Sequence, residues 1–218
     1  MSPGHVIAVL VSGSGSNLQA ILDASARGEI PGRVGVVISN KADAYGLVRA
    51  RNHGIPAEVV DHRAFGSREE FDVRLVEVIR SYRADLVCLA GFMRVVTPVF
   101  LRAFPQRILN IHPALLPSFP GTHGPRQALE YGVRFSGCTV HFLDEGVDTG
   151  PVIVQAVVPV YEDDTEETLA ARILKEEHRI YPMAIRLCLE GKLTISGRRV
   201  FVRETRRIAG FSRRNPDG

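Results

Sequence analysis

The feature that most constrains this sequence is a regular alternation of short apolar strands with amphipathic helices. Continuous β-branched and aliphatic runs of four to eight residues are typical of strands buried on both faces. We expect strands at 5–12, 33–39, 57–60, 86–90 and 108–112, with helices at 18–26, 44–53, 68–82 and 98–104 between them. Such an order predicts a parallel sheet covered by helices on both faces, as in Rossmann-like folds.

The pattern changes after the strand at 108–112. A loop rich in Pro and Gly is expected at 113–125, a helix at 127–131, strands at 138–143 and 152–160, a long helix from Thr165 to about residue 189, and a hairpin at 193–195 and 199–202. Thr165 predicts a helix N-cap, because two glutamates follow it in the first turn. The predicted fold class is therefore α/β, with a mostly parallel central sheet and a mixed C-terminal extension.

Length and composition indicate one globular domain over residues 1–218, because a chain of this size forms one sizeable core. Hydrophobic residues make up 45% and charged residues 23%, which argues against disorder and against a membrane protein. The apolar run from Val6 to Val11 is too short to span a bilayer and has no basic flank, so we expect a cytoplasmic protein.

The net charge of +3 belongs to the end of the chain. From Arg198 onward seven arginines face two acidic residues, giving +5, while the remaining 20 basic and 22 acidic residues give −2. Gly, Ser, Asn and Pro near the terminus favour a solvated tail over a nucleic-acid footprint. We expect no nucleic-acid partner.

The cysteine and histidine spacings favour neither a disulfide framework nor a metal site. Cys88, Cys138 and Cys188 are odd in number and lie far apart among apolar residues, which predicts buried, reduced thiols. His112 and His123 could converge with an acidic residue, but no histidine pair has the spacing of a helical zinc motif. We expect no metal.

A serine- and glycine-rich turn, residues 12–17, follows the first strand. Glycines allow close approach of a ligand, and free N–H groups at a helix start attract anions, so Gly15, Ser16 and Asn17 are candidates for binding a phosphate. The alternative is a structural turn capped by Asn17. No lysine completes a Walker motif, and Leu18 occupies the third glycine position of the dinucleotide fingerprint.

Three polar residues are candidates for chemistry. Asn110 and His112 share one face of a strand that Pro113 ends, at the sheet edge where ligands of open α/β folds bind. Two such donors can stabilise a developing oxyanion. Asp148 lies between two glycines, and a carboxylate near His112 would raise the imidazole pKa and keep the ring charged. Taken singly, each is more often structural, as we expect for His141.

These segments together resemble the phosphoribosylglycinamide formyltransferases, a folate-dependent family of purine synthesis. The resemblance is carried, from about residue 6 to 189, by the turn at 12–20, Leu89-Ala90-Gly91-Phe92-Met93-Arg94, Leu109-Asn110-Ile111-His112-Pro113 with Leu115-Leu116-Pro117, and Val140-His141-Phe142 ahead of Asp148-Thr149-Gly150-Pro151. It implies direct transfer of a formyl group from 10-formyltetrahydrofolate to the amine of glycinamide ribonucleotide, without a metal or a covalent intermediate.

The resemblance also implies roles for individual residues. Residues 1–105 would form a Rossmann-like phosphate-binding half, and residues 106–218 a catalytic and folate-binding half with the terminal hairpin and basic tail. The implied catalytic residues are Asn110, His112 and Asp148, the ribonucleotide would bind Gly15, Ser16, Asn17 and Glu177, and folate would bind Arg68, Met93, Arg94, Val95, Val96 and Asn110. The expected partners are these small molecules, for a monomer or homodimer.

Other functions remain open at this stage. Formyltransferases acting on initiator aminoacyl-tRNA usually carry an RNA-binding domain after this core, and hydrolases of formylated folate a regulatory domain before it. We expect neither extra domain, because the first strand begins at residue 5 and the last helix ends near residue 189.

A Rossmann oxidoreductase is disfavoured because Ser39-Asn40 stands where the ribose-binding acid of such enzymes would be. The Asn110, His112 and Asp148 set disfavours a non-catalytic nucleotide-binding module. No Gly-x-Ser-x-Gly elbow supports a serine hydrolase.

Overall fold

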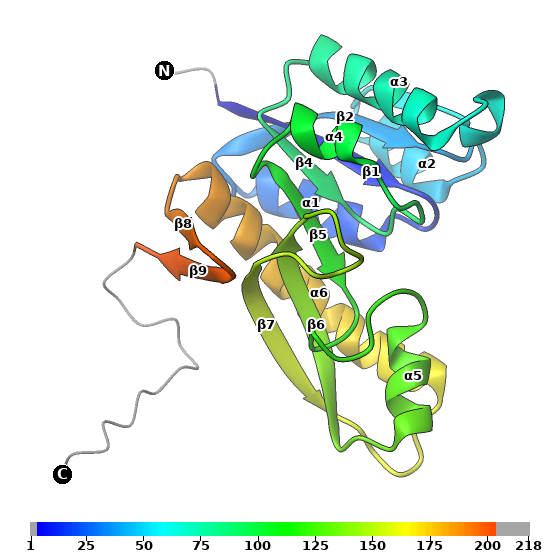
Figure 1. Cartoon of the computed structure of the whole chain (residues 1–218), viewed down its shortest axis with the longest axis vertical. Coiled ribbons are helices and arrows are strands. Elements are labelled where there is room, and N and C mark those ends of the chain that lie inside the picture. The colour runs from blue at the N-terminus through cyan, green and yellow to red at the C-terminus, as the bar shows by residue number, and fades with distance from the viewer. Residues whose placement is uncertain (1–3, 204–218) are drawn as a thin grey trace.

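A computed structural model describes residues 4–203 of the chain. Its core is a nine-stranded sheet with the order β3-β2-β1-β4-β5-β6-β7-β9-β8 (Figure 1). The five strands from β3 to β5 are parallel to their neighbours, β6 and β7 are antiparallel, and the β8–β9 hairpin joins β7 through a parallel contact. The sheet is therefore Rossmann-like at one side and mixed at the other.

The first part of the chain forms the parallel region. Its strands are β1 (His5–Val11), β2 (Gly32–Ser39), β3 (Ala57–Val59), β4 (Leu86–Leu89) and β5 (Ile108–His112), and its helices are α1 (Ser16–Ala26), α2 (Tyr45–Asn52), α3 (Arg68–Ser81) and α4 (Pro98–Ala103). Each lies within a few residues of the range expected from periodicity. A short 3₁₀ helix at His62–Ala64 has no counterpart in the sequence analysis.

The second part adds α5 (Gly124–Tyr131), β6 (Phe135–Phe142), β7 (Val152–Pro159), α6 (Glu166–Leu189), β8 (Leu193–Ser196) and β9 (Arg199–Val202). The N-cap prediction for α6 is confirmed, because the Thr165 hydroxyl accepts a hydrogen bond from the Thr168 backbone N–H. Long helix α6 crosses behind β5 and β6 in Figure 1 and packs along α1.

Two element boundaries differ from the prediction. Helix α5 starts at Gly124 and not near residue 127, because Pro125 occupies the first turn, where its missing N–H costs nothing. Strand β6 starts at Phe135 and not at residue 138. Only glycine fits at position 137 of this strand, because a Cβ there would lie 1.9 Å from the Ala156 carbonyl oxygen.

The two faces of the sheet bury separate clusters of apolar side chains. Helices α1, α2 and α6 cover one cluster, built around Leu18, Leu47 and Ile180. Helices α3 and α4 cover the other, built around Leu75 and Phe100. Burial of a large aliphatic or aromatic side chain contributes roughly 1.5–3 kcal/mol each. Helices thus cover both faces of the sheet, which confirms the prediction from the sequence.

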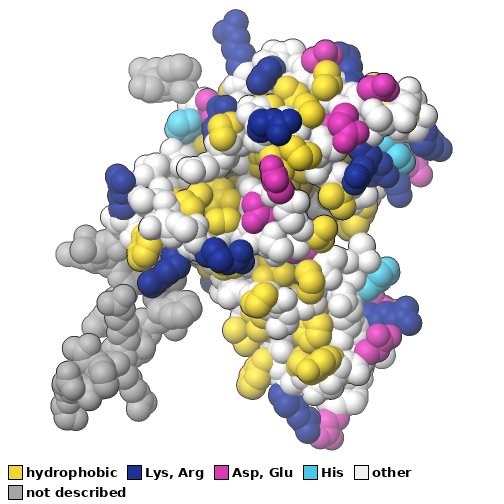
Figure 2. All heavy atoms as spheres, in the orientation of Figure 1, with side chains coloured by type: hydrophobic (Ala, Val, Ile, Leu, Met, Phe, Trp, Pro, Cys, Tyr) yellow, Lys and Arg dark blue, Asp and Glu magenta, His cyan; other side chains and the backbone are white. Residues whose placement is uncertain are grey.

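Exposed apolar and charged side chains are unevenly distributed. Figure 2 shows apolar side chains gathered over β6 and β7 and charged ones over the α3–α4 region. Phe135 and Val157 of this antiparallel pair are 62% and 61% exposed. No helix within residues 4–203 is long and apolar enough to cross a membrane. The basic tail lies largely outside the described residues.

The three thiols do not share one environment. Cys88 and Cys138 are buried and free, as expected. Cys188 is free but only partly buried, so the expectation of a buried thiol was wrong there. It lies on the last turn of α6, packs against the edge of the core cluster and lines a cavity described below.

Candidate active site

The turn after β1 opens α1 with free backbone donors. Gly15 is the N-cap and adopts a left-handed conformation with φ of 69°, and no side chain caps the helix. Asn17 is therefore not the structural cap considered above. Gly15 is also required by packing, because a Cβ would lie 2.7 Å from the Gly46 Cα. The N–H groups of Ser16 and Asn17 remain at a helix N-terminus, where anions bind.

Asn17 instead contacts Glu177 of α6. Its Nδ2 donates to Glu177 Oε2 at 2.7 Å, and both side chains are more than 90% buried. Burial raises the pKa of Glu177, and the bond from Asn17 offsets part of that rise. Asn17 Oδ1 is buried without a hydrogen-bond partner among the described residues. An unpartnered buried acceptor beside a carboxylate is suited to an N–H or O–H group of a ligand.

A serine joins this turn to the turn after β4. The Ser12 hydroxyl accepts from the Met93 backbone N–H at 2.8 Å and donates to Asn40 Oδ1 at 2.5 Å. The Ser12 N–H also donates to the Gly91 carbonyl. The candidate ribonucleotide turn and the candidate folate segment 93–96 are thus held together at one edge of the sheet.

The candidate folate segment, residues 93–96, presents apolar groups to solvent. Met93 and Val95 are 67% and 56% exposed, while Arg94 and Val96 are half-buried. The segment ends at Thr97, whose backbone N–H donates to buried Asp72 of α3 at 2.5 Å. Arg68 is exposed at the first position of that helix. Asp72 therefore connects the helix of Arg68 to the end of this segment.

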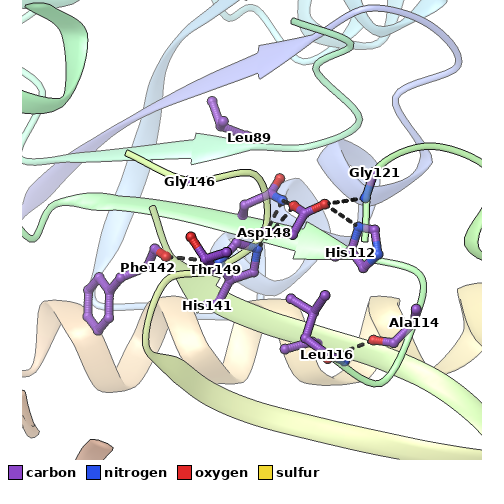
Figure 3. Close-up of polar contacts among 12 residues, drawn as sticks. Leu89, His112, Ala114, Leu116, Gly121, His141, Phe142, Gly146, Asp148 and Thr149 are labelled. Atoms are coloured by element: carbon purple, nitrogen blue, oxygen red, sulfur yellow. Dashed lines mark hydrogen bonds and ion pairs between the residues drawn. The ribbon is translucent and has the colours of Figure 1, made fainter. Parts of the chain in front are cut away.

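The structure brings Asn110, His112 and Asp148 into contact, and Figure 3 shows Asp148 with its dashed contact to His112. His112 Nδ1 lies 3.4 Å from Asp148 Oδ2, and Asn110 Nδ2 lies 3.4 Å from Asp148 Oδ1. Asn110 and His112 point to one face because they alternate along β5, and Asp148 reaches them from the 143–151 connection. The three side chains lie at the carboxyl end of a parallel strand, where ligands bind in such folds.

Asp148 is held in place by its neighbours. Its φ of 54° is left-handed, a conformation that Asp and Asn adopt more readily than other residues with side chains. Asp148 Oδ2 accepts from the Gly121 N–H at 2.8 Å, and Oδ1 lies 3.6 Å from His141 Nε2. Burial raises the Asp148 pKa, but the contact with His141, the bond from the Gly121 N–H and the charge of nearby His112 outweigh it, so the net pKa is lowered. Asp148 is therefore a carboxylate at neutral pH.

The expectation that His112 has a raised pKa was wrong. Burial lowers the pKa of this 4% exposed imidazole, and the nearby charge of Asp148 offsets only part of the effect. The geometry favours the charged ring nonetheless, because Nδ1 faces Asp148 and Nε2 lies 2.8 Å from the Phe119 carbonyl oxygen. Two acceptors are satisfied only by a ring with two N–H donors.

The loop between β5 and α5 covers this histidine. Thr139 Oγ1 donates to the Ala114 carbonyl oxygen at 2.7 Å and accepts from the Leu116 N–H, which anchors the start of the loop. Further along, Phe119 contacts His112 and Gly121 contacts Asp148. The Phe119 carbonyl of the loop therefore occupies the hydrogen-bonding position of His112 Nε2, the ring nitrogen that does not face Asp148.

Two residues close to the site were not singled out by the sequence analysis as functional. Arg49 of α2 donates through Nε to the Ser14 carbonyl at 2.9 Å, which places a cation beside the candidate phosphate-binding turn. Its charge, after burial, lowers the pKa of His178 on α6. His141, expected to be only structural, contacts both Asn110 and Asp148. Only the pairing register of β5 and β6 could have indicated that His141 lies beside Asn110.

The separate cavity, of about 300 Å³, lies away from these residues. Its lining includes His5, Asp85, Arg107 and Cys188, at the opposite ends of β1 and β4. None of the candidate site residues lines it. The carboxyl edge of the sheet is the better candidate because it brings together the polar side chains that can support catalysis.

Comparison with known families decides the assignment. The chain matches the family described as Formyl transferase over residues 5–185. The chain belongs to the formyl transferase family. Within residues 4–203, this formyl transferase has no group of three or more His, Cys, Asp or Glu side chains arranged to hold a metal ion, and His123 pairs instead with Glu166.

Individual relatives agree with this membership. The phosphoribosylglycinamide formyltransferase of Escherichia coli is 50% identical over 187 residues, covering 86% of this chain and 88% of its own length. A solved glycinamide ribonucleotide transformylase 1 from Symbiobacterium toebii has a TM-score of 0.92 at 60% identity, covering 94% of this chain and 96% of its own. The chain spans only 14% of the trifunctional purine biosynthetic protein adenosine-3 of Drosophila melanogaster, with 52% identity.

Proposed function

We propose that this formyl transferase moves the formyl group of 10-formyltetrahydrofolate onto the amine of N1-(5-phosphoribosyl)glycinamide, a step of purine synthesis. The observation that carries the proposal is the contact of Asn110, His112 and Asp148 beside a helix N-terminus suited to phosphate. The names of relatives that cover most of this chain support the choice of acceptor.

The proposed reaction needs little acid–base chemistry to begin. A free α-amino group has a pKa of about 7.7–8.0, so a useful fraction of the amine is neutral at pH 7. Its lone pair attacks the formyl carbon and forms a C–N bond, and the carbonyl electron pair moves onto oxygen. The intermediate then expels N10 of the folate, which takes a proton, while the amine nitrogen loses one.

The polar residues at the site stabilise that oxyanion. Asn110 Nδ2 and the His112 imidazolium are the proposed donors, and Asp148 holds the imidazole in orientation. For His112 to donate through Nε2, its hydrogen must exchange the Phe119 carbonyl for the formyl oxygen. Substrate binding is therefore coupled to a local movement of the 113–123 loop.

The remaining site residues are proposed to bind the two substrates. Gly15, Ser16 and Asn17 bind the phosphate end of the ribonucleotide, and Glu177 contacts the same molecule. Arg68 and the segment of Met93, Arg94, Val95 and Val96, together with Asn110, bind the folate. The exposed apolar side chains of Met93 and Val95 suit the flat ring system of a folate.

We also propose that residues 1–218 work as one formyltransferase domain, with halves at 1–105 and 106–218. A single sheet runs through both halves, and the candidate residues come from both. The partners are small molecules, with no metal and no nucleic acid, in a cytoplasmic monomer or homodimer.

A formyl-transfer assay tests the function. The protein is incubated with 10-formyltetrahydrofolate and glycinamide ribonucleotide, and folate absorbance is followed. Saturable turnover that depends on the ribonucleotide is expected. Turnover only with initiator aminoacyl-tRNA, or equal turnover without any acceptor, would instead identify a tRNA formyltransferase or a folate hydrolase.

A further inference from the structure

His141 is a buried histidine to which the proposed mechanism gives no role. It is 1% exposed and lies on β6, directly opposite Asn110 of β5 in the strand register. Opposed residues of an antiparallel pair share a face and have Cβ atoms about 4.5–5.5 Å apart. His141 is therefore the cross-strand neighbour of the proposed oxyanion donor.

One ring nitrogen of His141 has a fixed role. Nδ1 lies 2.9 Å from the Phe142 carbonyl oxygen, which can only accept, so Nδ1 carries a hydrogen. The other nitrogen, Nε2, lies 3.2 Å from Asn110 Nδ2 and 3.6 Å from Asp148 Oδ1. Only Nε2, which faces Asn110 and Asp148, is therefore free to change its hydrogen-bond partner.

The Nε2 atom decides which end of the Asn110 amide faces it. The two ends of an amide have nearly the same shape, so their partners determine the orientation. With Nε2 as an acceptor, the amide nitrogen of Asn110 faces His141 and Asp148, as in this structure. With a hydrogen on Nε2, the ring donates to Asp148 and favours the amide oxygen.

We propose that His141 is a positioning residue that sets the direction of the Asn110 amide, whose nitrogen also contacts Asp148. The inference rests on the proposed function, because it assumes that Asn110 donates to the formyl oxygen. Its physical basis is preorganisation. The Asn110 amide has two hydrogens, and when His141 Nε2 accepts one, the other, whose contact with Asp148 is long at 3.4 Å, is held in direction and remains to donate to the formyl oxygen. Without His141, the amide rotates among several directions.

The first test is a mutant cycle on kcat. His141→Ala is expected to lower kcat about tenfold to 100-fold, less than the roughly 100- to 1,000-fold cost of losing an oxyanion donor itself. KM for both substrates should stay nearly unchanged. In an Asn110→Ala background, His141→Ala should have little further effect, because the two residues act as one unit.

Conservative replacement gives the second test. His141→Gln places an amide that can donate or accept near the former Nε2 position, so most of kcat should return. His5→Ala is the matched control, since His5 is exposed at the amino end of β1, and the site lies at the carboxyl ends of the strands. An equal loss of kcat from His141→Ala in both backgrounds would overturn the inference, as would a folded His141→Gln that is as slow as His141→Ala.

A readout in the free protein separates this inference from the proposed function. Hydrogen exchange of the Asn110 side-chain amide, assigned by NMR through its loss in Asn110→Ala, should be slow in the parent and faster in His141→Ala. His141→Gln should restore the protection. If His141→Ala does not fold, His141→Leu, which fills the space without a hydrogen-bonding atom, takes its place. Unaltered exchange in the variant that lacks the ring refutes the inference whatever substrate accepts the formyl group, whereas absent transfer to glycinamide ribonucleotide refutes only the proposed function.

Discussion

Asp148 contacts two histidines and one backbone amide at once. His112 lies on one side, His141 on the other, and the Gly121 N–H donates from the covering loop. A carboxylate with several donors is stabilised in its charged form and is also immobilised. At the scale of single residues, Asp148 is thus the centre from which the other polar groups are oriented.

Asn110→Ala should reduce kcat by about 100- to 1,000-fold, the usual cost of removing one oxyanion donor. Folding should be retained, because Asn110 is only half-buried. Steady-state kinetics with far-UV circular dichroism measure both. Asn52→Ala, at the exposed end of α2, is the matched control. Unchanged turnover in Asn110→Ala would remove this residue from the mechanism.

Asp148→Asn should shift the pH–rate profile toward acid. Burial already lowers the pKa of His112, and Asp148 raises it in part, so loss of the carboxylate lowers it further. The charged imidazole then persists only at lower pH, and activity at pH 7 falls. Asparagine also accepts the left-handed backbone at this position.

NMR titration of the His112 ring measures this shift directly, alongside kcat as a function of pH. A profile and a His112 titration identical to those of the parent would show that the two groups are not coupled.

At the scale of elements, α6 connects the two halves of the site. Glu177 reaches Asn17 at the start of α1, and one turn later the Tyr181 hydroxyl lies 2.9 and 3.0 Å from the Leu89 and Leu109 carbonyl oxygens. Leu89 is the last residue of β4, and Leu109 precedes Asn110 in β5. One helix therefore aligns the proposed phosphate-binding turn with the strand that carries Asn110 and His112.

Glu177→Gln should weaken ribonucleotide binding without weakening the fold. Burial raises the Glu177 pKa, so its ionisation destabilises the folded state as pH rises from the unfolded pKa to the folded one. Glutamine removes that cost and still accepts from Asn17. We expect a higher KM for the ribonucleotide and a Tm at pH 8 equal to or above that of the parent.

Thermal melts and steady-state kinetics on the same samples provide the measurement. A lower Tm with an unchanged KM would indicate a purely structural glutamate.

Asp72→Ala should destabilise the protein by about 1–3 kcal/mol, because the Thr97 N–H loses its buried acceptor. The segment 93–96 is anchored through this bond, so KM for the folate should rise as well. Urea denaturation and folate kinetics test the pair of effects. Glu77→Ala, an exposed site on the same helix, should change neither. Parent-like stability in Asp72→Ala would contradict the anchoring role.

At the scale of the whole molecule, the site lies where the parallel part of the sheet meets the antiparallel part. Asn110 and His112 belong to β5, the last parallel strand, and His141 to β6, the first antiparallel one. An antiparallel neighbour presents its side chains directly opposite those of β5. The change of strand direction thus brings two polar sequence segments to one face.

A chain ending at Arg203 should keep the parent kcat/KM. Every proposed site residue lies within residues 4–203, and the Arg203 N–H closes the terminal hairpin on the Lys192 carbonyl. The formyl-transfer assay on the shortened protein measures this. A loss of activity at low salt that is restored by adding the tail peptide would assign a role to the basic residues beyond 203.

The sequence alone determined the order and kind of almost every element, because periodicity and helix caps are local properties. It also placed Asn110 and His112 on one face, since alternate strand residues always share a face. The start of α5 was missed because Gly124 and Pro125 are as common in loops as in first helical turns. Local pattern could not separate those two cases.

Only the tertiary structure decided which distant side chains meet. The Asn17–Glu177 bond spans 160 positions, and the His141 contact depends on the β5–β6 register. Tertiary burial also reversed the expected direction of the His112 pKa. Desolvation depends on everything packed around a group, whereas sequence reasoning weighed only the one charged neighbour it could identify.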